Sequence, residues 1–181
     1  MIKFWFKSIF RVDSIYKANL NNTYKNVAVD KIVVTMYLGS VINNPKTILY
    51  LLTSSNLITN QMPTVIKAKK SVSSLNVRKD MILGTRLTLR KEIAFNFLNL
   101  LISIILPNDK ENKLFKINNR GCVMLRLENL FSFPQINLFY DKFPKHINAD
   151  VNVVPSKKNK QLGTLLYSAL SIPLEKNLRK A

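Results

Sequence analysis

The segment Gly84 to Arg90 contains the residues whose types and spacing most clearly indicate chemistry. Side chains alternate between the two faces of a β-strand, so Thr85, Leu87 and Leu89 are expected to face a core. Arg86, Thr88 and Arg90 then share the opposite face. Two guanidinium groups flanking a hydroxyl can bind phosphate and sugar, although an ordinary solvated sheet face shows the same alternation.

A basic loop precedes this strand. Lys67, Lys69, Lys70, Arg78 and Lys79 lie within thirteen residues. Short polar residues between them can donate hydrogen bonds to phosphate or to a ribose 2′-hydroxyl; they are Ser71, Ser73, Ser74 and Asn76. The alternative is a charged loop that is simply solvated.

Nothing in the sequence favours an enzyme or a metal site. The ten acidic residues form no metal-binding or acid–base motif, and no phosphate-binding glycine loop occurs. Cys122 is the only cysteine and His146 the only histidine, which excludes an internal disulfide and a Cys/His zinc cluster. We therefore expect no catalytic residue, no metal and no cofactor.

The charge balance points to an anionic partner. The net charge is +18 over 181 residues and the pI is about 10.2, which suits nucleic acid or an anionic membrane surface. The longest apolar stretch, Phe95 to Leu106, is too short to span a bilayer and contains polar residues, so membrane insertion is not expected. Lys, Asn and Ile are abundant, and their AT-rich codons suggest an organellar genome.

The elements that must position these residues can be read from periodicity. Strands are expected at 31–38, 63–68, 83–90, 123–127 and 149–154, and the second and third should form a hairpin with the basic loop at its tip. Helices are expected after the Asn44-Pro45 cap, over 92–106 and over 162–170, with Pro107 and Pro173 ending the last two. The mixture predicts an α+β fold, an antiparallel β-sheet with α-helices packed on one face.

Two expected core stripes can be tested in a structure. The stripe of the 92–106 helix comprises Ile93, Phe97, Leu100, Leu101 and Ile104, and that of the 162–170 helix comprises Leu162, Leu165, Leu166, Ala169 and Leu170.

The expected domain organisation is a basic N-terminal arm over 1–26 and a single RNA-binding domain over 27–181. Phe6, Ile9, Phe10 and Asp13 lie on one side of a helix in the arm. The arm is either packed on the domain or inserted into RNA.

The central block resembles the ribosomal protein L5 family of the large subunit, in its bacterial and organellar form. The block is ITNQMPTVIKAKKSVSSLNVRKDMILGTRLTLRK, from Ile58 to Lys91. Matching positions are Gln61, Pro63, Lys67, Ala68, Lys69, Lys70, Ser71, Arg78, Gly84, Thr88, Leu89 and Arg90. Weaker but collinear similarity extends it over about 27–174, including Arg120-Gly121, Phe133-Pro134 and Tyr140-Asp141-Lys142.

This resemblance implies a structural constituent of the large subunit, in the central protuberance. The implied partners are 5S rRNA or its organellar replacement, adjoining large-subunit rRNA, peptidyl-site tRNA, a small-subunit head protein and neighbouring protuberance proteins. The implied rRNA-binding residues are Lys31, Gln61, Lys67, Arg86, Thr88 and Arg90. The implied tRNA-facing residues are Lys70, Ser71, Ser73, Ser74, Asn76, Arg78 and Lys79.

Departures from the family's pattern are also present. The first strand ends in Thr35-Met36-Tyr37-Leu38-Gly39 in place of Asn-Met-Gly-Val-Gly, Asn60 replaces a glycine, and 108–119 replaces an Arg-Gly-rich segment. With the composition, they favour a mitochondrial protein, a plastid being the alternative. Two other functions compete: an organellar RNA-processing or splicing factor, and a peripheral membrane protein anchored by Lys3 to Arg11.

Overall fold

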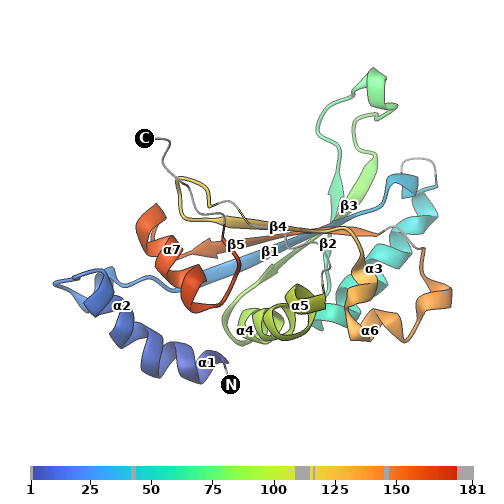
Figure 1. Ribbon diagram of the computed structural model, residues 1–181. Coiled ribbons are helices and arrows are strands. Elements are labelled where there is room, and N and C mark those ends of the chain that lie inside the picture. Colours follow the sequence, from blue (N-terminus) through green and yellow to red (C-terminus); the bar gives the residue numbers. More distant parts are fainter. Residues whose placement is uncertain (1, 42–43, 109–114, 116, 145–146, 175–181) are drawn as a thin grey trace, which may run out of the picture. The chain divides into compact units, whose positions relative to one another are not determined.

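The computed structural model describes residues 2–41, 44–108, 115, 117–144 and 147–174. The described residues form a five-stranded sheet in the order β2-β3-β1-β5-β4 (Figure 1). The strands are β1 (Val29–Tyr37), β2 (Thr64–Lys67), β3 (Ile82–Leu89), β4 (Val123–Leu127) and β5 (Asn148–Pro155). The fold is α+β with an antiparallel sheet, as predicted, and each predicted strand is present within two residues at either end.

The chain divides into two compact units. The first unit contains Met1–Ile32, Arg90–Leu125 and Asn152–Ala181, and the second contains Val33–Leu89 and Arg126–Val151. Each unit is described by itself below.

The helices account for most of the remaining described residues. The α-helices are α1 (Ile2–Trp5), α2 (Arg11–Lys17), α3 (Ile48–Thr59), α4 (Lys91–Leu100), α5 (Leu106–Asn108), α6 (Pro134–Asn137) and α7 (Lys160–Ala169). None of the helices in the described residues is both long and apolar enough to cross a membrane.

In the second unit, α3 packs against β3 and α6. Its buried residues are Ile48, Leu51, Ser54, Ser55, Ile58 and Thr59. The predicted Asn44 cap is wrong in detail, because the Asn44 side chain caps nothing. The Asn44 backbone carbonyl accepts hydrogen bonds from the Thr47 N–H and hydroxyl, so a 3₁₀ turn over Pro45–Thr47 leads into the helix.

In the first unit, α4 continues through a π-turn over Leu101–Ile105 into α5. The predicted core stripe was partly wrong, because Ile93 and Ile104 are exposed while Ala94, Leu98 and Ile105 are buried. This helix is apolar on nearly every side, so periodicity alone does not fix the buried face. The predicted stop at Pro107 is wrong, because the helix includes Pro107 and Asn108, the last residue described in this segment.

The N-terminal residues form a helix that packs on the first unit. Phe6, Phe10 and Ser14 are buried at four-residue spacing, with a π-turn over Phe6–Phe10 between α1 and α2. The rings of Phe6 and Phe95 lie 5.5 Å apart, and Lys3 is ion-paired with Glu92. Ile9, predicted on the packed side, is 55% exposed because the π-turn rotates it outward. Of the two alternatives for the arm, the structure shows the packed helix, because Phe6 and Phe10 are buried.

Helix α7 is anchored by a residue that the predicted stripe omits. Tyr167 is fully buried, and its hydroxyl donates to the Val153 carbonyl at 2.9 Å. Burial raises the pKa of Tyr167, with a smaller contribution from Cys122. Leu166 and Leu170 are buried as predicted, whereas Leu162, Leu165 and Ala169 are only half-buried.

Candidate RNA interface

The β2–β3 hairpin carries the central pair of predicted site residues. On β3, Thr85, Leu87 and Leu89 are buried, while Arg86 and Thr88 are exposed, so the alternation predicted from the sequence is confirmed there. Thr64 of β2 lies opposite Arg86, and its hydroxyl donates to the Arg86 backbone carbonyl at 2.9 Å. Thr64, Arg86 and Thr88 therefore share one face, which we call the hairpin face.

The chemistry of the hairpin face suits an anion. Among the described residues no carboxylate pairs with the Arg86 guanidinium, so its donors are available to a ligand. A planar guanidinium can donate in parallel to two oxygens of one phosphate, and the Thr88 hydroxyl can donate or accept beside it. This face can hold a sugar–phosphate backbone.

A glycine allows β3 to approach β1 closely inside the second unit. A Cβ atom on Gly84 would lie 2.4 Å from the Met36 carbonyl oxygen, closer than real Cβ contacts. Gly84 also pairs with Ile66, next to a register shift between Ile66 and Lys67. The glycine in the central block is thus required by packing.

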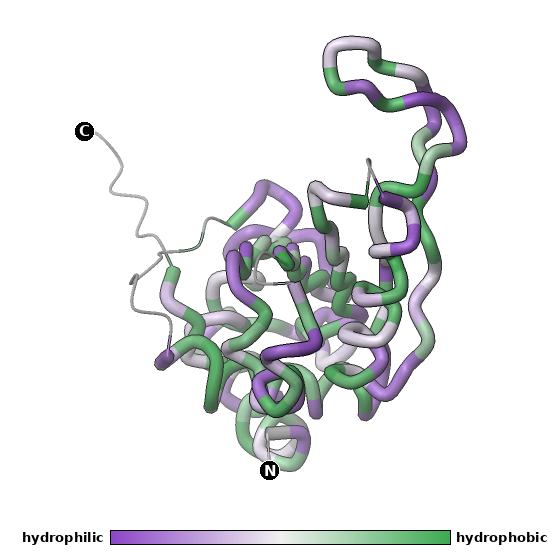
Figure 2. Tube along the Cα trace, turned by 90° about the vertical axis from the view of Figure 1, so that its right-hand side faces the viewer, coloured by the Kyte–Doolittle hydropathy of each residue, from purple (hydrophilic) through white to green (hydrophobic). Residues whose placement is uncertain are grey.

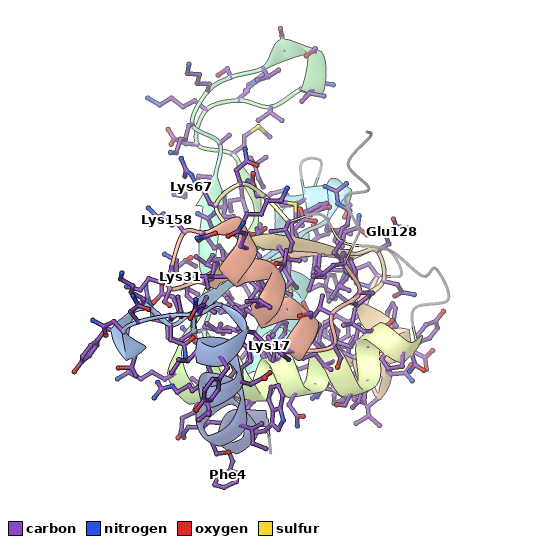
Figure 3. All side chains as sticks on the ribbon, turned by 60° about the vertical axis from the view of Figure 1, so that its left-hand side comes forward. Phe4, Lys17, Lys31, Lys67, Glu128 and Lys158 are labelled. Atoms are coloured by element: carbon purple, nitrogen blue, oxygen red, sulfur yellow. The ribbon has the colours of Figure 1, made fainter. Side chains whose placement is uncertain are left out.

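Two other predicted rRNA-binding residues of the second unit lie apart from the hairpin face. Lys67 is exposed at the end of β2, where Figure 3 labels it. It is three residues from Thr64, so the alternation of the strand places it on the opposite face. Gln61 is half-buried in the turn after α3, where its N–H donates to the Thr59 hydroxyl at 3.3 Å. Asn60, which replaces the family's glycine, adopts a left-handed conformation at φ 53° that Asn tolerates well.

The remaining predicted rRNA-binding residues, Lys31 and Arg90, belong to the first unit. Lys31 is half-buried on β1. Arg90 is exposed one residue beyond β3, and its Nη1 lies 3.3 Å from Asp30 Oδ1. Arg90 therefore already has a partner within the chain, which the strand pattern did not predict.

The predicted tRNA-facing loop is locally ordered. The N–H groups of Val72 and Val77 each donate to the other's carbonyl, at 2.8 and 3.1 Å, around a 3₁₀ turn over Ser73–Leu75. Asn76 closes this turn in the left-handed region at φ 53°. At the base, Ala68 donates to the Met81 carbonyl and accepts from the Asp80 N–H. The loop is a second, smaller hairpin.

All predicted residues of this loop are exposed. The loop extends away from the ends of β2 and β3, and hydrophilic residues recur along it (Figures 1 and 2). Lys70, Arg78 and Lys79 supply its cations, while the Ser71 hydroxyl accepts the Lys79 N–H at 3.0 Å and keeps its proton free to donate. Such a loop can contact a phosphate backbone.

Sequence reasoning missed Thr64 as a member of the site. Its exposure and its place opposite Arg86 depend on the hairpin register, and one strand's alternation does not reveal which residue stands across from it. The bond from Thr64 also orients the Arg86 backbone.

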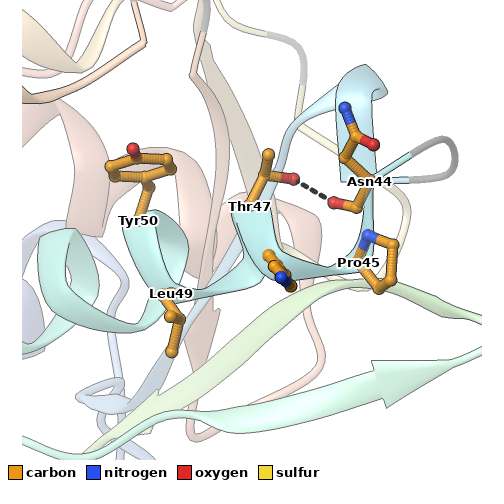
Figure 4. Close-up of a pocket in the computed structure, with 6 residues that line it drawn as sticks. Asn44, Pro45, Thr47, Leu49 and Tyr50 are labelled. Carbon is orange, nitrogen blue, oxygen red and sulfur yellow. Dashed lines mark hydrogen bonds between the residues drawn. The ribbon is translucent and has the colours of Figure 1, made fainter.

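The pocket at the start of α3 has no group suited to acid–base catalysis. This pocket of about 620 Å³ is lined by Asn44, Pro45, Lys46, Thr47, Leu49 and Tyr50 (Figure 4), without a carboxylate or imidazole among them. No group of three or more metal-binding side chains occurs in the described ranges. Cys122 is a free, half-buried thiol, and His146 lies outside the described residues.

Comparison with known proteins gives a consistent class. Residues 22–78 match the family model described as "Ribosomal protein L5". The chain is 35% identical over 178 residues to "Large ribosomal subunit protein uL5m" of Reclinomonas americana, covering 97% of this chain and 98% of that protein. It is 31% identical to "Large ribosomal subunit protein uL5" of Leuconostoc mesenteroides over 90% and 91% of the two chains.

A third relative, uL5 of Geotalea daltonii, is 32% identical over 86% of this chain and 87% of its own length. Near full-length coverage, together with the α+β fold and the basic hairpin, defines a structural protein of the large ribosomal subunit, not an enzyme. The chain belongs to the ribosomal protein L5 family.

Proposed function

We propose that this chain binds 5S rRNA, or its organellar replacement, and the adjoining large-subunit rRNA in the central protuberance of a mitochondrial ribosome. The observation that carries the proposal is the hairpin face, where Arg86 and Thr88 are exposed on a strand whose alternate side chains are buried. A strand fixed by a buried core has its backbone already ordered, so only the side chains lose freedom on binding, which favours binding of a defined backbone shape.

The loop over 70–79 is proposed to approach peptidyl-site tRNA. Its exposed Lys70, Arg78 and Lys79 can contact phosphates without reading bases, which suits a site that must accept every tRNA. The inner hairpin around Val72 and Val77 supports this role, because a shaped loop reaches a partner at lower entropic cost than a random one.

The remaining partners are proposed from family membership. They are a small-subunit head protein and the neighbouring proteins of the central protuberance. The mitochondrial location is supported by the relative named uL5m and by the Lys-, Asn- and Ile-rich composition, with a plastid ribosome as the alternative.

The test is an affinity measurement on the full chain with a transcript of the large-subunit rRNA from the same organism, with 5S rRNA added where it is encoded. The double variant Arg86→Gln/Thr88→Ala removes the donors of the hairpin face and should weaken binding by about tenfold to a hundredfold, as for lost bidentate phosphate contacts. Lys46→Gln, in the 3₁₀ turn before α3, serves as a control cation of the second unit that is not part of the hairpin face. Equal affinity of the folded double variant and the control would overturn the proposed surface.

A further inference from the structure

A second group of cations, none of them among the residues assigned above, lies in the first unit. Lys157, Lys158 and Lys160 follow β5 and lead into α7, where Lys158 is labelled in Figure 3. Arg120 belongs to a different segment, the tight turn before β4. We call Arg120, Lys157, Lys158 and Lys160 the cationic patch.

Backbone packing brings the two segments of the cationic patch together. Gly121 has a φ of 75°, and a Cβ atom on it would lie 2.7 Å from the Asn159 carbonyl oxygen. A Cβ atom on Gly163 would likewise lie 2.9 Å from Gly121. The turn that carries Arg120 is therefore in backbone contact with the residue between Lys158 and Lys160.

The position of both segments is fixed by hydrogen bonds. The Gly121 N–H donates to the Asn118 carbonyl at 2.8 Å, and the Asn118 N–H donates to the Cys122 carbonyl at 2.9 Å. Ser156, just before the lysines, donates its N–H to Ala28 and accepts the Ala28 N–H on its hydroxyl. The patch thus stands on ordered backbone.

Its charges have no acidic partner among the described residues. Each described carboxylate of the first unit is paired with another cation: Asp13 with Lys17, Asp30 with Arg90, and Glu92 with Lys3. Like charges held close together repel one another, and an anionic ligand removes that cost.

The side chains around the patch indicate which polyanion it fits. Its neighbours in the chain are Asn118, Asn119, Ser156, Asn159 and Gln161. They are polar and can hydrogen-bond to phosphate and sugar oxygens, whereas a surface that inserts into a membrane has apolar side chains beside its cations. The Asn159 side chain already accepts the Gln161 N–H, so the lysines and Arg120, and not the helix end, supply the attraction.

The geometry points to a second RNA-binding surface, in which the cationic patch contacts the phosphate backbone of structured RNA. Lysine contributes point charges without the fixed geometry that base recognition requires, so contact with the backbone is expected to be independent of sequence. This inference shares with the proposed function only the identity of the ligand as RNA. It does not depend on the hairpin face.

The experiment measures the affinity of the full chain for the same rRNA transcript across a series of salt concentrations. The patch variant carries Arg120→Gln, Lys157→Gln, Lys158→Gln and Lys160→Gln. Because each lost phosphate contact reduces the slope of log affinity against log salt by about one, the slope should fall by roughly three to four, with at least a tenfold loss of affinity.

The charge-matched comparison uses two pairs of substitutions. Lys157→Gln/Lys158→Gln lies outside any helix and should reduce the slope by about two, whereas Lys46→Gln/Lys142→Gln in the second unit should leave it unchanged. If both pairs change the slope equally, only net charge matters and the inference is overturned. It is also overturned if the patch variant keeps its RNA affinity but loses flotation with vesicles containing phosphatidylserine.

Failure of the two proposals can be told apart. If Arg86→Gln/Thr88→Ala has no effect while the patch variant has one, the hairpin face is wrong and the cationic patch stands. If the patch variant has no effect while Arg86→Gln/Thr88→Ala has one, only the cationic patch is wrong. Thermal unfolding of each variant verifies that the fold is intact.

Discussion

The ion pair with Asp30 distinguishes Arg90 from Arg86, although the strand pattern makes the two arginines look equivalent. Arg86 projects from the hairpin face, whereas Arg90 lies 3.3 Å from a carboxylate sixty residues earlier in the chain. Both partners are about half exposed, so the pair contributes at most about 1 kcal/mol to stability. An RNA phosphate can therefore compete with Asp30 for the guanidinium.

Replacing Asp30 tests whether Arg90 also serves RNA. In Asp30→Asn the guanidinium is released and a negative charge is removed, so affinity for the rRNA transcript should rise by roughly twofold to fivefold, equivalent to about 0.5–1 kcal/mol. Arg90→Gln should lower it. If neither variant changes affinity while both lower the unfolding temperature slightly, Arg90 has only a structural role.

Gly84 is the second residue whose role is set by a single contact. A methyl group there would collide with the Met36 carbonyl oxygen, so Gly84→Ala should lower the free energy of unfolding by about 1–3 kcal/mol. Gly39→Ala is the matched control, because nothing lies within 4 Å of its added Cβ atom. Denaturant unfolding of both proteins measures the difference, and equal stability would contradict the close approach of β3 to β1.

At the scale of elements, the basic loop should be separable from the domain that carries it. Nearly every side chain from Ser71 to Lys79 is exposed, so replacing 71–79 by a Gly-Ser turn should change the unfolding temperature little. Peptidyl-site tRNA affinity of the assembled subunits should fall. Arg78→Gln/Lys79→Gln keeps the loop and removes charge, and should reproduce part of that loss.

Two measurements decide between a tRNA contact and an assembly element. They are the incorporation of the shortened protein into large subunits and the tRNA affinity of those subunits. Poor incorporation with normal tRNA affinity would assign the loop to assembly.

The elements also mark what the sequence can and cannot predict. The strands could be predicted because side chains alternate between the two faces of a sheet, and the burial of β4 and β5 alternates in this way. The buried faces of the helices were harder to predict. The π-turns at Phe6–Phe10 and Leu101–Ile105 change which side of the helix faces the core, and no local sequence pattern predicts these turns. Ile9 and Ile104, which lie within these π-turns, were misplaced for this reason, and Ile93 was misplaced because its helix is apolar on several sides.

The site was predictable where it depends on one strand and not where it depends on two segments. Alternation identified Arg86 and Thr88. The facing Thr64 and the Asp30 partner of Arg90 both arise from pairing between distant segments. The cationic patch was missed similarly, because Arg120 approaches Asn159 only through the backbone contact at Gly121.

At the scale of the whole molecule, the buried core explains how so basic a chain can fold. With +18 overall, self-repulsion opposes compaction, yet the core contains large buried apolar side chains from both units. Among the described residues, the loop, the hairpin face and the cationic patch all contain cations without an acidic partner, and these can bind a polyanion. Such a protein is expected to gain stability when RNA binds, because a ligand that binds only the folded state stabilises it.

The central claim is that this chain contacts large-subunit rRNA through the hairpin of β2 and β3. Ultraviolet cross-linking of large subunits isolated from the source organism, followed by mass spectrometry of the RNA-linked peptides, tests it most directly. Peptides spanning 64–90 should carry rRNA nucleotides. Recovery of the protein in those subunits, with RNA-linked peptides only from elsewhere in the chain, would contradict the account.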